Sequence, residues 1–474
     1  MKERSGKRIR RFLSCLTAAL LLACSFLSGM TPAYAVTAWP SLPESVNAGA
    51  AICMDAETGA ILYGKNINVK HYPASITKIM TALLVLENCE LSDMVTFSES
   101  AVSNLEPGAV TAFTSAGDQL SVRDCLYALL FRSANEVANA LAEHVAGSVE
   151  AFADLMNQRA RELGCTNTHF VNPNGLNNSE HYTTAYDMAL IAKACMENPA
   201  FLELETEDSH TIGSTQKRPN GLTVTLGHKM KRSGTAYSDS RVVAGKTGYT
   251  SMAGNTLVTM AEDGGRRIVA VVLQDRNPLH YVDTKDMLDL GFSAFENVDA
   301  GDLFDASEVE ARLVTDGVIP AGEGANHLEA DREIRASLPV GASVSDLSYK
   351  YEYNLAGNAP EDAVAKLTLY SGDHTAGEYF VINSRESNLS ILDVSTPAKV
   401  AIVSISLVSV IGVIAFLLLG SGTAWHVHNV RVENQRLARM RRRRRRRLEA
   451  MGMSEEEFRA LVERRRNKPG DRRK

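Results

Sequence analysis

Ser75 and Lys78 are a serine and a lysine three positions apart, a pair that could act as nucleophile and base. Pro73 precedes them and good helix formers follow from Thr81, which predicts a helix that begins near Ser75. Residues three apart share one face of a helix, so the two side chains would be within reach of each other. A serine hydroxyl attacks only when a base takes its proton, and a lysine serves as that base only when burial or another cation lowers its pKa. Alone, such a pair is weak evidence for catalysis.

Two further motifs strengthen the hypothesis. Ser133-Ala134-Asn135 falls in a short break between two expected helices, and Lys246-Thr247-Gly248 ends an expected strand and is followed by Tyr249. Ser-x-x-Lys, Ser-x-Asn and Lys-Thr-Gly in this order are the signature of serine β-lactamases and penicillin-binding proteins. Because the order, the spacing and the expected element agree at all three sites, we interpret them as one active site.

The chain closely resembles the low-molecular-mass penicillin-binding proteins, the serine-type D-alanyl-D-alanine carboxypeptidases. The resemblance is strong over about residues 50–295 and includes segments 170–176 and 181–187 and the Ala253-Gly254-Asn255 sequence. It implies a β-lactamase/transpeptidase-like domain, a small C-terminal β domain and anchoring on the outer face of the membrane. The substrate would be the peptidoglycan stem peptide, β-lactam antibiotics would be covalent inhibitors, and no cofactor or metal is expected.

The resemblance also implies roles in acyl transfer. Ser75 would attack the acyl carbon, and Lys78 would take its proton. Ser133, held between Lys78 and Lys246, would pass a proton to the departing amine. The positive charge of Lys246, together with burial, would keep Lys78 neutral.

The remaining motif residues would bind the substrate. Asn135 would bind a substrate amide, and Lys246 and Thr247 would hold a carboxylate. Gly248 would keep the strand edge bare, so that an extended peptide can lie alongside it. The backbone N–H groups of Ser75 and Tyr249 would bind the oxyanion.

One position departs from the family. Members often carry an arginine before the helix that closes the catalytic domain, where it assists with the substrate carboxylate. Here His280 stands at what looks like the matching place, with Arg276 nearby. Which of the two assists is left open.

Three other functions are alternatives for a chain with these motifs. A β-lactamase shares the motifs, but class A enzymes activate the deacylating water with a glutamate, and residues 166–178 contain no acid; Glu180 lies just beyond. We therefore expect slow deacylation and trapping by penicillin. A D,D-endopeptidase would use the same chemistry on a different leaving group. A catalytically inactive wall-binding protein is disfavoured because all three motifs are complete.

The elements expected around these residues make an α+β fold, in which helices flank an antiparallel sheet. A hairpin is expected over residues 50–63, and three strands of a meander over 241–246, 254–261 and 266–273. Between them we expect helices at 121–130, 136–145, 151–163 and 184–196, and after them a closing helix at 283–295. Short runs such as 311–314, 365–370 and 378–382 predict strands of a small all-β domain.

The two ends of the chain predict targeting to a membrane. Residues 1–35 have a basic start, an apolar run and an Ala33-Tyr34-Ala35 cleavage site, as in a signal peptide. An uncleaved anchor and a lipoprotein site at Cys24 are the alternatives. Residues 400–420 are long and apolar enough to span a bilayer, and the arginine-rich tail that follows would stay on the cytoplasmic side. That tail is interpreted as a topology signal, with binding to anionic lipid compatible.

These segments divide the chain into a signal peptide (1–35), a catalytic domain (36–298), a β domain (299–388), a linker (389–399), a membrane helix (400–420) and a cytoplasmic tail (421–474). Because both ends are basic, the net charge of −6 leaves about −23 on the part outside the membrane, which disfavours nucleic acid as a partner. That part has five cysteines without Cys-x-x-Cys spacing, which argues against a metal site; buried thiols are expected, with one disulfide possible. They are Cys53, Cys89, Cys125, Cys165 and Cys195.

Overall fold

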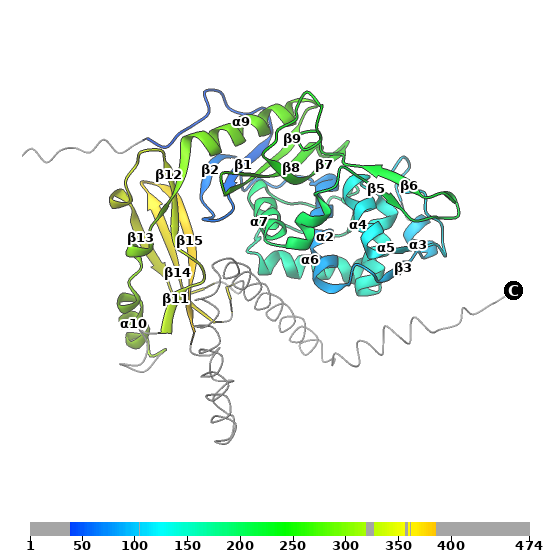
Figure 1. Ribbon diagram of the computed structural model, residues 1–474. Helices are drawn as coiled ribbons and strands as arrows, with labels where there is room; N and C mark the ends of the chain where they lie inside the picture. The colour runs from blue at the N-terminus through cyan, green and yellow to red at the C-terminus, as the bar shows by residue number, and fades with distance from the viewer. Residues whose placement is uncertain (1–37, 104, 319–326, 356–358, 361, 385–474) are drawn as a thin grey trace, which may run out of the picture.

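The computed structural model describes residues 38–103, 105–318, 327–355, 359–360 and 362–384 (Figure 1). The expected signal peptide, linker, membrane helix and cytoplasmic tail lie outside the described residues. Within these ranges, no helix has both the length and the apolar character needed to cross a membrane.

The catalytic part is built on one antiparallel sheet of five strands, in the order β2-β1-β9-β8-β7. Strand β1 pairs with β9, so the N-terminal hairpin and the meander, expected as two units, form a single sheet. Strand β7 lies at one edge of it. The strands are β1 (Ala50–Asp55), β2 (Ile61–Lys65), β7 (Val242–Thr250), β8 (Gly254–Asp263) and β9 (Arg266–Asp275).

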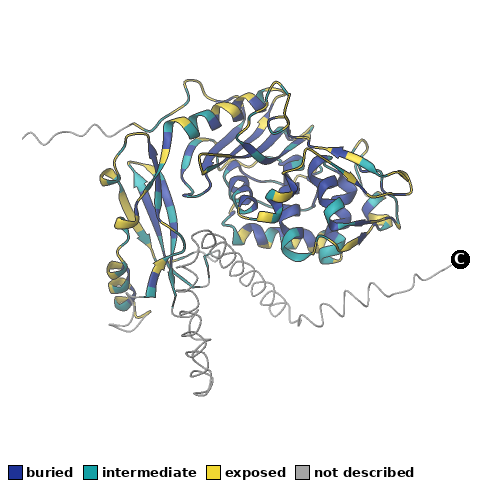
Figure 2. Ribbon diagram, viewed as in Figure 1, coloured by how far each residue is buried: buried dark blue, intermediate teal, exposed yellow. Residues whose placement is uncertain are grey.

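Both faces of this sheet are covered, because successive side chains of a strand point to opposite faces. Ile52 and Val271 pack into the core shared with the helices that follow β2, whereas Cys53 and Val272 pack on the other side, against α9 (Leu279–Ala294). Strand β1 is therefore buried along its whole length, and β8 and β9 are buried over most of theirs (Figure 2). Helix α9 begins four residues before the expected start of the closing helix, 283.

The expected helices of the catalytic part are present, with ends shifted by a few residues. Ser121, where the first of these helices was expected to begin, caps it, since its hydroxyl accepts the N–H of Asp124 at 3.0 Å. Two small two-stranded sheets were not predicted: β3 (Met94–Thr96) with β4 (Gln119–Ser121), and β5 (Ser209–Ile212) with β6 (Leu222–Thr225). The helices are α2 (Lys78–Asn88), α3 (Glu99–Ser103), α4 (Val122–Phe131), α5 (Asn135–Ala146), α6 (Val149–Glu162), α7 (Ala185–Met196) and α8 (Pro199–Leu204).

The C-terminal part contains two sheets and a helix, so the expectation of an all-β domain is wrong in one element. Residues 311–314, predicted as a strand, belong to helix α10 (Ala306–Thr315). Asp305 caps this helix, and Val309 and Leu313, four residues apart, bury one helical face. The strands are β10 (Phe295–Asp299) paired with β12 (Arg335–Pro339), and the sheet β11 (Leu328–Ala330), β15 (His374–Asn383), β14 (Ala363–Ser371) and β13 (Ser348–Glu352).

The turn between β1 and β2 joins the two parts. The hydroxyl groups of Thr58 and Ser337 lie 2.7 Å apart and are buried, and the N–H of Glu378 donates to the carbonyl of Thr58 at 2.9 Å. Glu57 pairs with Arg335 at 3.3 Å. The C-terminal part is therefore held at the β2 side of the sheet, away from the β7 edge (Figure 1).

Four of the cysteines agree with the expectation of buried thiols. Cys53, Cys125, Cys165 and Cys195 are free and buried, and burial raises the pKa of each thiol. Cys89 is only half-buried.

Candidate active site

Ser75 lies in a single 3₁₀ turn (Ala74–Thr77), and Lys78 is the first residue of α2. The α-helix therefore begins three residues later than the sequence predicted. The two side chains still meet, because the Nζ of Lys78 lies 3.0 Å from the Oγ of Ser75. Ser75 is half-buried, whereas Lys78 is fully buried.

The surroundings of Lys78 favour a neutral amine. Burial lowers its pKa well below the usual value, the charge of Lys246 lowers it further, and Glu136 opposes both. Its Nζ also donates to the carbonyl of Asn174 and, at 2.9 Å, to the Oδ1 of Asn135. A neutral lysine at hydrogen-bond distance from a serine can take the hydroxyl proton.

Ser133 and Ala134 lie in the predicted break between α4 and α5, and Asn135 is the first residue of α5. Ser133 has a φ of +63°, in the left-handed region that costs a residue with a β-carbon free energy. Its buried Oγ has no hydrogen-bond partner among the described residues. Asn135 is held in place, since its backbone N–H and its Nδ2 each donate to the carbonyl of Val110 at 2.9 Å. The segment therefore places the Ser133 hydroxyl, which has no partner among the described residues, next to the fixed amide side chain of Asn135.

Lys246, Thr247 and Gly248 lie within strand β7, which continues to Thr250, so the expected strand, 241–246, ended four residues too early. Lys246 is only 3% exposed, and burial lowers its pKa to about 8 while the Glu205 carboxylate opposes this. As the edge strand, β7 can accept an extended peptide along its unpaired side. Tyr249, 67% exposed, lies on this strand.

Besides keeping the strand edge bare, Gly248 has a second structural role that was not predicted from the sequence. A β-carbon at this position would collide with the Oγ1 of Thr256 and would lie 2.9 Å from the backbone nitrogen of Ser75. The same Oγ1 donates to the carbonyl of Pro73 at 2.8 Å. Glycine thus lets β7 approach the turn that carries the nucleophile.

Segments 170–176 and 181–187, which contribute to the family resemblance, contact the turn that carries Ser75. Gly175, at a φ of +81°, passes so close to the Ala74 carbonyl that no side chain would fit. The Oγ1 of Thr77 lies 2.9 Å from the Nε2 of His181, and burial lowers the pKa of that histidine to about 3, so the ring is neutral. These contacts fix the backbone on either side of Ser75.

Glu205 was not predicted from the sequence to lie in the site. Its carboxylate is fully buried next to Lys246 and Lys231, and both of its oxygens lack a side-chain partner. Burial raises its pKa to about 7, and the two lysines oppose this. Glu205 belongs to none of the three motifs, and nothing in the sequence around the end of α8 indicated that it would lie next to Lys246.

Arg276 and His280, left open above, differ in accessibility. His280 is buried in the first turn of α9 against Tyr281, and burial lowers its pKa. Arg276 is exposed just after β9, whose residue Asp275 is paired with Asn255 of β8. Asn255 in turn is paired with Tyr249 of β7, so Arg276 follows the sheet end at which the β7 motif lies.

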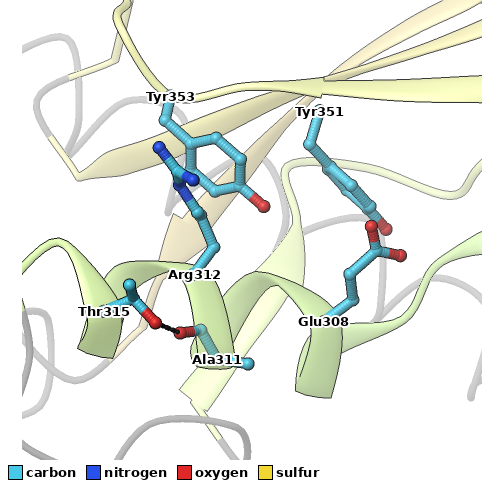
Figure 3. Close-up of a pocket in the computed structure, with 6 residues that line it drawn as sticks. All are labelled: Glu308, Ala311, Arg312, Thr315, Tyr351 and Tyr353. Carbon is cyan, nitrogen blue, oxygen red and sulfur yellow. Dashed lines mark hydrogen bonds between the residues drawn. The ribbon is translucent and has the colours of Figure 1, made fainter.

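A separate hollow of about 620 Å³ lies in the C-terminal part, between α10 and β13. Figure 3 shows Arg312 alongside the ring of Tyr353, and its guanidinium carbon lies 5.8 Å from the ring centre. The hollow contains no residue of the three motifs, and its lining residues are Glu308, Ala311, Arg312, Thr315, Tyr351 and Tyr353.

A serine paired with a buried lysine of lowered pKa, beside an edge strand on a sheet enclosed by helices, is typical of the serine acyl-transfer enzymes that bind penicillin. Comparison with known proteins supports this class. Residues 36–277 match the family model described as D-alanyl-D-alanine carboxypeptidase. Since this match covers half of the chain, the protein belongs to the D-alanyl-D-alanine carboxypeptidase family.

Individual relatives agree. The chain is 35% identical to the D-alanyl-D-alanine carboxypeptidase DacF of Bacillus subtilis, over 52% of this chain and 63% of the relative. It is also 35% identical to DacC of Escherichia coli, over 60% of this chain and 71% of the relative. Penicillin-binding protein 5 of Haemophilus influenzae superposes with a TM-score of 0.54 at 26% identity, over 73% of this chain and 99% of that structure.

Proposed function

We propose that this protein is a serine D-Ala-D-Ala carboxypeptidase that removes the terminal D-alanine from peptidoglycan stem peptides. The observation that carries the proposal is the contact of Ser75 with a buried Lys78 of lowered pKa, beside the β7 edge. Lys78 takes the Oγ proton as Ser75 attacks the carbonyl carbon of the penultimate D-alanine. The negative charge that develops on the carbonyl oxygen is bound by the backbone N–H groups of Ser75 and Tyr249.

The tetrahedral intermediate then collapses. The C–N bond to the terminal D-alanine breaks as Ser133 donates its proton to the departing amine, and Lys78 replaces that proton with the one it took from Ser75. The rest of the peptide remains as an ester on Ser75. Water hydrolyses this ester and restores the serine. Asn135 holds the peptide amide, and Lys246, Thr247 and Arg276 bind the terminal carboxylate.

A β-lactam acylates the same serine, and we propose that the adduct is long-lived. Residues 166–178 contain no acidic side chain. This segment contacts Lys78 through the carbonyl of Asn174, which accepts a hydrogen bond from the Lys78 Nζ. Glu180, just beyond, is exposed. With no carboxylate there to activate a water, hydrolysis of the penicilloyl ester is slow, which disfavours a β-lactamase.

We also propose that the protein is anchored in the cell membrane by one helix at 400–420, with the catalytic domain outside and the tail inside. The proposal rests on the sequence pattern of the two ends. Protease added to intact cells should remove the catalytic domain and spare the basic tail. A fragment of residues 36–398 should keep activity, because no motif lies outside it.

The test of function uses a diacetyl-Lys-D-Ala-D-Ala peptide and measures free D-alanine with and without penicillin. We expect release that penicillin blocks, and neither release nor penicillin labelling in Ser75→Ala. Labelling that persists in Ser75→Ala would refute the nucleophile. Stable labelling of Ser75 without release from this peptide would favour the D,D-endopeptidase, whose substrate is a cross-linked peptide.

A further inference from the structure

Three side chains capable of binding a metal converge at a place far from the catalytic motifs. The Sγ of Cys89, a carboxylate oxygen of Asp93 and a ring nitrogen of His144 all lie within 4.8 Å of one another. Cys89 and His144 are half-buried, and Asp93 is exposed. The cysteine spacing gave no hint of this cluster, because two of its three members are not cysteines.

From this convergence we propose that Cys89, Asp93 and His144 form a binding site for a divalent transition-metal ion of the Zn²⁺ type. Thiolate, imidazole and carboxylate are the three ligand groups that Zn²⁺ uses in proteins. Ligand atoms on a tetrahedral zinc ion lie about 3.5 Å apart, so the side chains need to close by only about 1 Å. Three protein ligands leave the fourth position to water or to a ligand from solution.

The backbone around the cluster favours a cation. Cys89 is the residue that caps the C-terminus of α2, and His144 lies in the last turn of α5. The C-terminus of a helix carries a partial negative charge, and here two such ends meet at the same three ligand atoms. The site therefore offers negative potential in addition to the Asp93 carboxylate.

Asp93 is also held in position before any ion binds. The N–H of Glu90 donates to the Oδ2 of Asp93 at 3.0 Å, and the N–H of Val122 donates to the Asp93 carbonyl at 2.8 Å. Little rearrangement is then required for binding.

The same two helices carry catalytic residues at their other ends. Helix α2 begins with Lys78 and α5 begins with Asn135, and these two side chains are hydrogen-bonded at 2.9 Å. With 11 and 12 residues, the helices are about 16–18 Å long. Helices α2 and α5 are thus already joined at their N-termini by this hydrogen bond, and a bound ion would also join their C-termini. Such an ion would stabilise the fold and would not take part in the chemistry.

The test uses the full-length, tag-free protein, reduced and freed of metal. Titration with Zn²⁺ against a chromophoric chelator should show one ion per chain, and Cys89→Ser and His144→Gln should each weaken binding by about tenfold or more. His210→Gln is the matched control, because His210 lies 2.9 Å from Asp124 and 3.4 Å from Glu207 without a cysteine. Circular dichroism shows whether each variant is folded.

Two further readouts locate the ion. Co²⁺ should give a sulfur-to-cobalt charge-transfer band that Cys89→Ser loses and His210→Gln keeps. Zn²⁺ should also protect Cys89 from alkylation, followed on its own peptide by mass spectrometry. Absence of binding to the wild-type protein, or equal binding to the wild type and to folded Cys89→Ser and His144→Gln variants, would overturn the proposal.

Discussion

A β-carbon on Gly248 would lie 2.9 Å from the backbone nitrogen of Ser75, so glycine is what lets the edge strand and the nucleophilic turn come together. Tyr249 follows Gly248 in β7, so the two N–H groups proposed to bind the oxyanion, those of Ser75 and Tyr249, come from the two segments that this glycine allows to approach. In the proposed mechanism the glycine therefore serves oxyanion binding as well as access for the peptide.

Gly248→Ala should slow acylation of Ser75 by about 10²–10³-fold, the usual effect of losing one oxyanion donor. The added methyl group pushes β7 away from Ser75 or Thr256. The second-order rate with a fluorescent penicillin measures this. Gly301→Ala, where the new β-carbon would lie 3.3 Å from the Oδ1 of Asp299 in the C-terminal part, should acylate normally. A normal rate in Gly248→Ala would show that the close approach is dispensable.

The rate of acylation should depend on pH through two lysines. It should rise as pH passes the lowered pKa of Lys78, which must be neutral, and fall as pH passes about 8, where Lys246 loses its charge. Lys246→Arg should remove the alkaline fall up to about pH 10, because a guanidinium keeps its proton beyond pH 12. An unchanged alkaline limb in this variant would assign that limb to another group.

Glu205 should set the position of the alkaline limb. Its carboxylate raises the pKa of Lys246, so Glu205→Gln should move the limb from about pH 8 to lower pH, by about 0.5–1 unit. Glu203→Gln is the control, since Glu203 is an exposed residue that pairs with Arg123. A loss of rate at every pH without a shift would mean that Glu205 acts only through the structure.

Arg276 should contribute to carboxylate binding. Arg276→Ala should lower kcat/KM for a peptide ending in D-Ala-D-Ala by about ten- to hundredfold, the range expected for a charged hydrogen bond. With the same peptide amidated at its C-terminus, the variant and the wild type should differ little. Equal losses on both peptides would show that Arg276 does not act on the carboxylate.

Asp275 should make stability depend on pH. Burial raises its pKa from 3.8 to about 6, so the folded state holds the proton more tightly than the unfolded state. Stability is then lost as pH rises through about 4 to 6. Asp275→Asn, which mimics the protonated form, should raise Tm by about 2–4 °C at pH 8 and change it little at pH 4. Asp263→Asn, at the exposed end of β8, should change Tm at neither pH.

The sequence by itself determined the chemical groups and their local settings. Ser75, Lys78, Ser133, Asn135, Lys246, Thr247 and Gly248 were identified from their types and spacing. The cap at Ser121 and the hairpin of β1 and β2 also follow from the chain, because capping and alternation act between near neighbours. Where local pattern was ambiguous, as at 311–314, it gave a strand in place of α10.

Only the tertiary structure decided what depends on contacts between distant segments. Three relationships join residues that are far apart in the sequence: β1 pairs with β9, Gly248 approaches Ser75, and the buried Glu205 lies beside Lys246. The cluster of Cys89, Asp93 and His144 forms because α2 and α5 end at the same place. Periodicity reports which face of an element is buried, whereas packing selects the partner that buries it.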